Sequence, residues 1–258
     1  MSHCLRLSPQ SCGDSGCSVR SNSVVRISEC DLTIERRAEI RAEFQAFGSA
    51  RIVDFLAPDA AAAASEVLQS FDAWSVVSIA PDGTPICLDW KDWERSRPDG
   101  RQPYSSNASF QYLFKSYPLV ERLRDGCAAG VLRTIAEYLT GTRFRRIVAD
   151  ATGHGEFIHV DGFASRFEGG HFLTTHTDKQ PPGTPGIRKV AYSLNLTTQW
   201  DNDWGGQTAF WSDHDLPICL PPTYNTLLLF AVPRPHSVLY VPPYARGARI
   251  ALTGWLHE

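Results

Sequence analysis

The residues with the clearest capacity for chemistry are His176, Asp178 and His236. In a β-strand, side chains two residues apart lie on the same face, so His176 and Asp178 would present an imidazole and a carboxylate side by side. A second imidazole from His236 would complete a set of two histidines and one carboxylate. Such a set holds ferrous iron on one face and leaves three coordination positions open, which is typical of non-haem iron centres.

His-x-Asp is a weak motif by itself, because the sequence also contains His159-Val160-Asp161. The residues that follow each pair decide between them. Behind Asp178 comes an ordered series: a loop rich in proline and glycine (179–186), a strand-like run (189–196), Gly205-Gly206, His236 and Arg249. Choosing Asp161 would leave an additional strand inside this series. We therefore interpret His159 and Asp161 as structural groups, or as groups that support the metal ligands from the preceding strand.

This ordered series resembles the iron(II)- and 2-oxoglutarate-dependent oxygenases, specifically the branch similar to prolyl 4-hydroxylases. Within that branch the sequence is most similar to the group that includes prolyl hydroxylases of ribosomal and translation proteins and their bacterial relatives. The resemblance is strong over 164–256 and fainter over 49–71 and 110–141. It implies that His176, Asp178 and His236 hold Fe(II), and that 2-oxoglutarate and O2 take the open positions. It also implies that ascorbate can support the reaction.

Arg249 is the residue that the resemblance assigns to the far carboxylate of 2-oxoglutarate. A guanidinium fork suits a buried carboxylate, because it can donate two parallel hydrogen bonds. We prefer it to Arg246, which lies in the loop 242–247. Relatives often place tyrosines at the positions of Phe167 and Ser193, and neither residue supplies a phenol here. We expect Ser193 and Thr208 to bind 2-oxoglutarate instead.

Three further residues are candidates for contact with the substrate or for gating: Arg166, Lys189 and Trp255. The loop 179–186 could cover the mouth of the site, since loops of this kind often close over substrates. Lys189 could meet an acidic group, although a lysine at the surface needs no such explanation. By the alternation of a strand, Trp255 should share the inward face of Arg249.

These residues need a scaffold, and the pattern predicts an α+β, mainly β fold: a double-stranded β-helix, or jelly roll, buttressed by N-terminal helices. We expect a flexible tail over 1–30 and one oxygenase domain over 31–258, with helical support over 31–141 and the jelly-roll core over 142–258. In the front half we expect a helix ended by Gly48, an alanine-rich helix and a β-hairpin. The predicted front elements are helices over 31–47, 60–71 and 117–139, helical spacing over 110–114, a strand over 51–56, a hairpin of 74–79 with 85–90 and a loop over 91–104. The strands predicted behind Gly141 are 145–148, 156–160, 164–167, 171–175, 189–196, 208–211, 226–230, 237–241 and 249–255.

Composition limits the possible partners. A formal net charge of −3 gives no basic surface, so we expect no nucleic acid as partner. No apolar run approaches the ~18 residues of a membrane span, and residues 1–30 lack the apolar segment of a secretory signal. We expect a cytoplasmic monomer or homodimer without a membrane partner. Seven cysteines without a Cys-x-x-Cys pair favour reduced thiols, with a zinc site in the cysteine-rich tail as an alternative.

The predicted activity is hydroxylation of an unactivated C–H bond, with release of succinate and CO2. By resemblance, the substrate would be a prolyl residue in a protein. A free amino acid or a small biosynthetic intermediate stays open as substrate, and so does a jelly-roll binding module without catalysis. A zinc hydrolase is disfavoured, because no dedicated general base accompanies the metal ligands.

Overall fold

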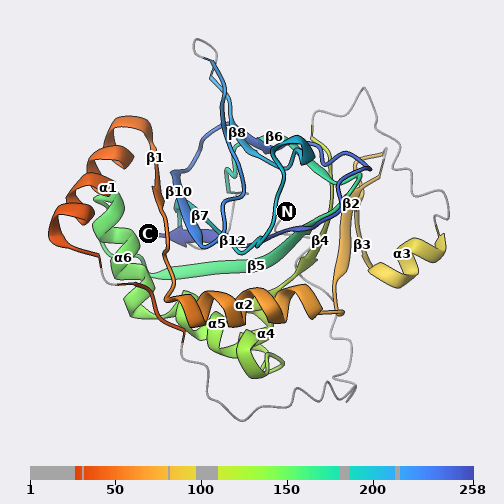
Figure 1. The fold of residues 1–258 in the computed structure, drawn as a ribbon, viewed down its shortest axis with the longest axis horizontal. Coiled ribbons are helices and arrows are strands. Elements are labelled where there is room, and N and C mark those ends of the chain that lie inside the picture. The colour runs from red at the N-terminus through yellow and green to blue at the C-terminus, as the bar shows by residue number, and fades with distance from the viewer. Residues whose placement is uncertain (1–26, 31, 81, 97–109, 181–185, 213–215) are drawn as a thin grey trace.

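A computed structural model describes residues 27–30, 32–80, 82–96, 110–180, 186–212 and 216–258. The predicted mainly β architecture is confirmed, because a curled antiparallel sheet carries most of the chain and helices cover one of its faces (Figure 1). The helices are α1 (Ile34–Phe47), α2 (Pro58–Ser70), α3 (Trp90–Ser96), α4 (Leu119–Arg124), α5 (Gly130–Thr140), α6 (Thr142–Thr152) and the 3-10 turn η1 (Asn202–Trp204). The strands are β1 (Ser49–Ile52), β2 (Ser75–Ile79), β3 (Pro85–Asp89), β4 (Tyr112–Tyr117), β5 (His159–Phe167), β6 (Phe172–His176), β7 (Arg188–Asn195), β8 (Thr208–Phe210), β9 (Ile218–Leu220), β10 (Thr226–Ala231), β11 (His236–Val238) and β12 (Arg249–His257).

The sheet runs in the order β1-β10-β7-β12-β5-β4-β6-β11-β8-β9, and β2 and β3 extend it from β4. Strands far apart in sequence are neighbours, so β12 lies between β5 and β7 along most of its length. β4 pairs with both β5 and β6, so it lies between the strand that ends at Phe167 and the strand that ends at His176. The sheet thereby folds around an interior.

The two faces of the sheet have different partners. Ile250, Leu252 and Leu256 of β12 pack into a large apolar core against the helices. The alternate side chain of Trp255 joins a second apolar cluster in the interior of the sheet, together with Phe163 of β5. This confirms the predicted alternation along β12, and it means that inward side chains of β5, β7 and β12 share one compartment.

Local sequence explains the helix ends that were predicted correctly. The hydroxyl of Thr33 accepts a hydrogen bond from the Arg36 amide and so caps α1, and Gly48 ends α1 in the left-handed conformation with a φ of 64°. Pro58 stands in the first turn of α2, where its missing N–H costs nothing. The predicted hairpin is confirmed as β2 paired with β3.

Several predicted elements were wrong. The run 145–148 is not a strand but part of α6, whose buried face is formed by Phe144, Val148 and Ala151 at helical spacing. The helical spacing over 110–114 instead belongs to β4, which is buried on both faces and therefore shows no alternation. The loop 91–104 begins with α3, and 97–104 lies outside the described residues.

The boundary between support and core also needs correction. β1 to β4, from the front half, join the sheet, whereas α6, from the back half, is part of the helical support. Of the predicted tail, 1–26 lies outside the described residues. Residues 27–30 belong to the fold, since Ile27 is buried in the main core and the Cys30 amide donates to the Phe55 carbonyl. Within the described residues, no helix combines the length and the apolar character needed to cross a membrane.

Candidate active site

His176, Asp178 and His236 come together at one end of the interior. His176 is the last residue of β6 and His236 the first of β11, and the two are directly opposite in the register of this strand pair. The Asp178 carboxylate reaches both imidazoles: Oδ1 lies 3.2 Å from His176 Nε2, and Oδ2 lies 3.4 Å from His236 Nε2. Each residue therefore offers a ligand atom within 4.8 Å of the other two, so the three could bind one metal ion.

Asp178 reaches this position through an uncommon backbone conformation. Its φ is 57°, in the left-handed region that Asp and Asn tolerate better than most residues do. The chain leaves β6 at this point, and the left-handed turn allows the carboxylate to lie beside His176. A short polar side chain at position 178 is thus favoured by the backbone as well as by the metal.

Both histidines are oriented by backbone carbonyl groups. His176 Nδ1 lies 3.0 Å from the Thr174 carbonyl oxygen, and His236 Nδ1 lies 2.8 Å from the Arg234 carbonyl oxygen. An N–H at each Nδ1 donates to a carbonyl, which fixes the orientation of each ring and turns both Nε2 atoms toward Asp178. A metal ion bound between the three residues would take the Nε2 lone pairs in place of the contacts to the carboxylate.

The carboxylate of Asp178 is ionised despite its burial. Burial by itself would raise the pKa of Asp178, but hydrogen bonds and charge from His176 and His236 outweigh burial and hold this pKa well below its usual range. Among the described residues, the ion-pair partners of this carboxylate are the two histidines alone. A divalent cation would find one negative charge and two neutral nitrogen donors.

A narrow pocket extends from these three residues into the interior. Its walls are mostly apolar and include Phe163, Phe230 and Trp255. Of the residues predicted from the sequence, Arg249, Ser193, Thr208 and Trp255 all line it. The structure thus brings the predicted metal ligands and the predicted 2-oxoglutarate ligands into one compartment.

Arg249 is the only cation that lines this pocket among the described residues. It is 4% exposed; its Nη2 donates to the Thr208 hydroxyl at 3.1 Å, and its guanidinium carbon lies 5.2 Å from the Phe167 ring. Burial lowers the pKa of Arg249 to about 10, so the side chain stays charged at neutral pH. No carboxylate of the described residues forms an ion pair with it.

Other polar atoms around the pocket also lack partners within the described part of the chain. Arg249 Nε, Ser193 Oγ and Trp255 Nε1 are buried without a hydrogen bond. Buried polar groups are usually satisfied, and each orphan group costs about 1–3 kcal/mol. An anionic ligand with several oxygen atoms would satisfy them. The donor set therefore fits 2-oxoglutarate, just as the two histidines and one carboxylate fit Fe(II).

A second cluster has the same residue types. Asp161 Oδ1 lies 2.8 Å from His159 Nε2, and Asp161 Oδ2 lies 2.9 Å from His257 Nε2. His257 was not predicted from the sequence; it is brought to this cluster by pairing directly with His159 between β12 and β5. The three ligand atoms lie within 4.8 Å of one another, so distance alone does not separate this cluster from the first.

The charged residues around the two clusters do distinguish them. Arg124 Nη2 lies 3.0 Å from His159 Nε2 and 3.9 Å from Asp161, and Arg188 Nη2 lies 3.9 Å from Asp161 as well. A divalent cation about 4 Å from one guanidinium would be repelled by about 8 kcal/mol at an effective dielectric constant near 20. Two arginines thus disfavour a metal ion here. The prediction that His159 and Asp161 are not the iron ligands agrees with this charge balance.

Arg188 is a site residue that sequence reasoning missed. Strict alternation from Ser193 would turn Lys189 inward and Arg188 outward. The register between β7 and β12 shifts by one residue: Leu256 pairs with Val190, but the next residue, His257, pairs with Arg188. Lys189 is therefore the extra, unpaired residue of a β-bulge, and Arg188 takes the inward position. Arg188 is consequently buried, with its guanidinium carbon 3.8 Å from the Trp255 ring centroid and Nη1 3.4 Å from the Asp178 carbonyl oxygen.

Two predicted residues do not reach the pocket. Arg166 lies on the opposite face of β5, where it contacts Glu168 and donates to the Gln69 carbonyl. Lys189 is part of the rim outside the pocket, with Nζ 3.6 Å from Glu258. Their assignment to a substrate contact therefore needs correction: Arg166 follows the outward parity of its strand, and Lys189 is displaced by the bulge. Of the loop 179–186, which was expected to cover the site, residues 181–185 lie outside the described residues.

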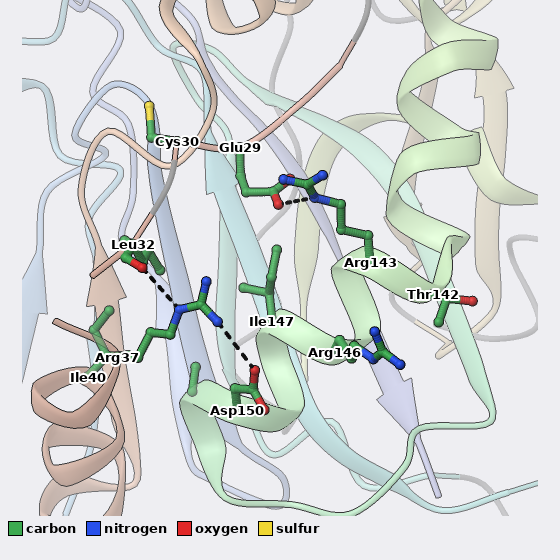
Figure 2. Close-up of a pocket in the computed structure, with 11 residues that line it drawn as sticks. Glu29, Cys30, Leu32, Arg37, Ile40, Thr142, Arg143, Arg146, Ile147 and Asp150 are labelled. Atoms are coloured by element: carbon green, nitrogen blue, oxygen red, sulfur yellow. Dashed lines mark hydrogen bonds and ion pairs between the residues drawn. The ribbon is translucent and has the colours of Figure 1, made fainter. Parts of the chain in front are cut away.

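Another pocket lies between α1, α6 and residues 29, 30 and 32 (Figure 2). Its charged side chains are largely paired, since Glu29 contacts Arg143 while Arg37 contacts both Asp150 and the Leu32 carbonyl oxygen. It shares no lining residue with the pocket that holds His176. Both groups of possible metal ligands among the described residues lie outside it.

Comparison with known proteins agrees with this site. Residues 163–257 match the family model of the 2OG-Fe(II) oxygenase superfamily. No sequence among the curated proteins matches the chain. Among solved structures, a Pseudomonas putida prolyl-4-hydroxylase has a TM-score of 0.54 at 16% identity and covers 86% of this chain and 98% of its own.

Two other solved structures are similar in fold. A Trichoplax adhaerens prolyl hydroxylase, in complex with a hypoxia-inducible-factor peptide, has a TM-score of 0.58 at 17% identity, with 86% of this chain and 88% of that chain covered. A non-haem α-ketoglutarate-dependent carbocyclase from nogalamycin biosynthesis has a TM-score of 0.54 at 10% identity, with 88% and 85% covered. At these identities the likeness concerns the fold. The match to the 2OG-Fe(II) oxygenase superfamily thus covers residues 163–257, and this part of the enzyme carries His176, Asp178 and His236 as its candidate iron site.

Proposed function

We propose that this enzyme hydroxylates an unactivated C–H bond of a prolyl residue in a protein, using Fe(II) and 2-oxoglutarate. The observation that carries the oxidation chemistry is one compartment that is lined both by a two-histidine, one-carboxylate cluster and by the buried guanidinium of Arg249. The fold likeness to prolyl 4-hydroxylases supports the prolyl residue as substrate.

In this proposal each residue has a physical role. His176, Asp178 and His236 hold the iron through Nε2, a carboxylate oxygen and Nε2. Arg249 and Thr208 bind the far carboxylate of 2-oxoglutarate, and the Ser193 hydroxyl, which is buried without a partner among the described residues, donates to it. When bound, iron and 2-oxoglutarate supply an oxidant derived from O2 that attacks a C–H bond, and succinate and CO2 are released.

The apolar walls have a function of their own in this chemistry. Phe163, Phe230 and Trp255 surround the pocket and leave little room for water. Exclusion of water strengthens the attraction between Arg249 and a carboxylate, because the local dielectric constant is low. It also directs the oxidant to the substrate, since side reactions with water are suppressed.

The first test concerns the metal and the co-substrate. Anaerobic addition of Fe(II) and 2-oxoglutarate should produce a weak visible charge-transfer band in the native protein. A protein that gives no band, even after fresh iron is added, would not be an Fe(II)/2-oxoglutarate oxygenase. The same absence in an otherwise folded protein would favour a jelly-roll binding module.

The second test concerns the substrate. Cell extract incubated with native enzyme and with the Asp178→Ala variant should be compared by mass spectrometry for products that gain one oxygen atom. Native-specific hydroxyproline in proteins is the expected result. Modification of small molecules alone would overturn the prolyl proposal and favour the second candidate, a free amino acid or a biosynthetic intermediate. The likeness in fold to the carbocyclase from nogalamycin biosynthesis supports that second candidate.

A further inference from the structure

The imidazole of the candidate iron ligand His236 takes its orientation from one carbonyl group. His236 Nδ1 lies 2.8 Å from the Arg234 carbonyl oxygen, and this contact turns Nε2 toward the Asp178 carboxylate, 3.4 Å away. The position of that carbonyl therefore determines where the Nε2 lone pair points. Whatever holds residue 234 in place also orients the metal ligand.

Arg234 lies in a turn that can form few backbone hydrogen bonds. It stands between Pro233 and Pro235, and a proline has no N–H to donate. The flanks of the turn are fixed by backbone hydrogen bonds of 2.9 Å from the Val232 amide and 3.0 Å to the Pro235 carbonyl oxygen. Between these flanks, the Arg234 side chain supplies a further anchor.

The side chain of Arg234 is anchored at two points. Its Nη1 donates to the Phe47 carbonyl oxygen at 2.8 Å, and its guanidinium carbon lies 4.0 Å from the centroid of the Phe210 ring. A planar guanidinium can stack on a ring and donate hydrogen bonds from its edge at the same time. The two contacts together restrict this half-buried side chain to one orientation.

Each anchor lies in a regular element. Phe47 is the last residue of α1, and carbonyl groups at a helix C-terminus lack partners within the helix, so they accept favourably from a cation. Phe210 is the last residue of β8 and is directly opposite His236 in the register of β8 and β11. Arg234 thus connects the turn before His236 to the end of a helix and to a neighbouring strand.

We propose that Arg234 is a positioning residue of the iron site, whose side chain fixes the carbonyl group that orients His236. The inference rests on the proposed function, because it takes His236 as a ligand of Fe(II). Without the guanidinium, the peptide of residue 234 gains freedom, and the imidazole samples orientations in which Nε2 no longer faces Asp178. The fold keeps a second link at this place, since the Ala231 amide donates to the Gly48 carbonyl at 2.9 Å.

NMR of the metal-free protein tests the orientation of the ring directly. His176 and His236 each donate from Nδ1 to a backbone carbonyl, so His176 serves as an internal reference. In protein with isotope-labelled histidine, both Nδ1 protons should exchange slowly with water. In Arg234→Met the His236 proton should exchange at least about tenfold faster, and the His176 proton should be unaffected.

Metal affinity is the second readout. Co(II) serves as the probe in place of Fe(II), because imidazole and carboxylate ligands bind both ions and Co(II) is stable in air. Arg234→Met should bind Co(II) about tenfold more weakly than native protein, as expected for a residue that orients a metal ligand. Arg234→Lys should recover part of the affinity, since a lysine can still donate to the Phe47 carbonyl. Titration followed by visible absorption measures all three proteins.

Thr33→Ala provides the matched control. The Thr33 hydroxyl caps the N-terminus of α1, at the end opposite to Phe47, so this variant weakens the same helix without a change near His236. Urea unfolding verifies that each variant is folded. Thr33→Ala should keep the native Co(II) affinity. An equal loss of affinity in Thr33→Ala and Arg234→Met would show that metal binding follows the stability of α1, and it would overturn the proposal.

Three further results would contradict the positioning role. One is a folded Arg234→Met protein that keeps either the native exchange of the His236 proton or the native Co(II) affinity. The second is equally faster exchange at His176 and His236, which would indicate general loosening. The third is a native protein whose His236 proton is not protected. Failure of the proposed function looks different: a native protein that binds neither Co(II) nor Fe(II), while its His236 exchange still depends on Arg234, would refute the oxygenase and retain the orienting contact.

Discussion

The Nη2 atom of Arg249 donates its hydrogen bond to the hydroxyl oxygen of Thr208, a neutral partner, at 3.1 Å. A buried guanidinium that is paired with a hydroxyl keeps its full charge in an apolar compartment. Burying an uncompensated charge costs several kcal/mol, so folds keep one only where a ligand offsets that cost. The part of the pocket around Arg249 is therefore preorganised to bind an anion.

The first prediction follows from that charge. Arg249→Met should raise the KM for 2-oxoglutarate by about 100-fold, because a charge-assisted pair contributes about 1.5–3 kcal/mol and its loss also leaves a buried carboxylate unpaired. Succinate formation as a function of 2-oxoglutarate concentration measures the effect. Arg246→Met serves as the matched control and should leave the KM unchanged. If Arg246→Met raised the KM for 2-oxoglutarate and Arg249→Met did not, the carboxylate would be bound by the loop 242–247 instead.

The second prediction separates the two His-x-Asp pairs. Asp178→Ala should abolish bound iron, the charge-transfer band and succinate formation, because it removes the only carboxylate among the described residues that faces both His176 and His236. Asp161→Asn should retain iron, since two arginines beside Asp161 disfavour a metal there. Iron content per chain after desalting measures both. Iron retained by Asp178→Ala and lost by Asp161→Asn would exchange the roles of the two pairs.

The third prediction concerns pH. Burial by itself would raise the pKa of Asp161, but hydrogen bonds and charge from His257 and His159 outweigh it, and this pKa is lowered to about 2. An acid with a lowered pKa in the folded state stabilises the fold above its unfolded pKa, near 4, and this stabilisation is lost as the pH falls toward 2. Its size is about 2 kcal/mol.

Urea unfolding of the native protein and of Asp161→Asn, at several values between pH 5 and 2, tests this linkage. The native free energy of unfolding should fall more steeply with acid than that of the variant. Parallel curves would mean that Asp161 titrates with the same pKa in the folded and unfolded states.

The fourth prediction concerns the packing behind the site. Gly162 and Gly254 are opposite each other on β5 and β12, and a Cβ at Gly162 would meet the Tyr192 hydroxyl. Gly162→Ala should therefore destabilise the fold by about 2–3 kcal/mol, and by less than about 1 kcal/mol in a Tyr192→Phe background. A double-mutant cycle in urea measures this coupling.

Gly254→Ala provides the control for that cycle. Its Cβ would overlap the Asp161 carbonyl oxygen, which is backbone and cannot move away cheaply. Tyr192→Phe should not rescue it. Equal rescue of both alanine variants would show that loss of the hydroxyl acts through a general relaxation of the sheet.

Part of the arrangement around the pocket could be predicted, because strand alternation is a local property. Alternation correctly turned Trp255 inward, into the pocket that Arg249 also lines. His176, Asp178, His236 and Arg249 were singled out by their order in the chain together with the resemblance to a known family, and the structure brings all four to one pocket.

What the sequence could not show depends on tertiary pairing. The bulge that turns Arg188 inward arises between β7 and β12, and nothing in either strand alone marks it. His257 joined Asp161 only because β12 lies beside β5. The predicted strand over 145–148 was wrong for a different reason. A short apolar run fits a strand or a helix equally well, and packing of α6 against α1 and α5 favours the helix.

β12 is hydrogen-bonded along both edges, to β5 and to β7, so it cannot slide in either direction. The Arg249 guanidinium and the Trp255 indole are attached to this one strand, and the strand rises about 3.3–3.4 Å per residue. The separation of these two side chains, which both line the pocket, is consequently a constant of the strand. A displacement of Arg249 along the pocket would have to break the pairing of β12 with β5 and with β7 at once.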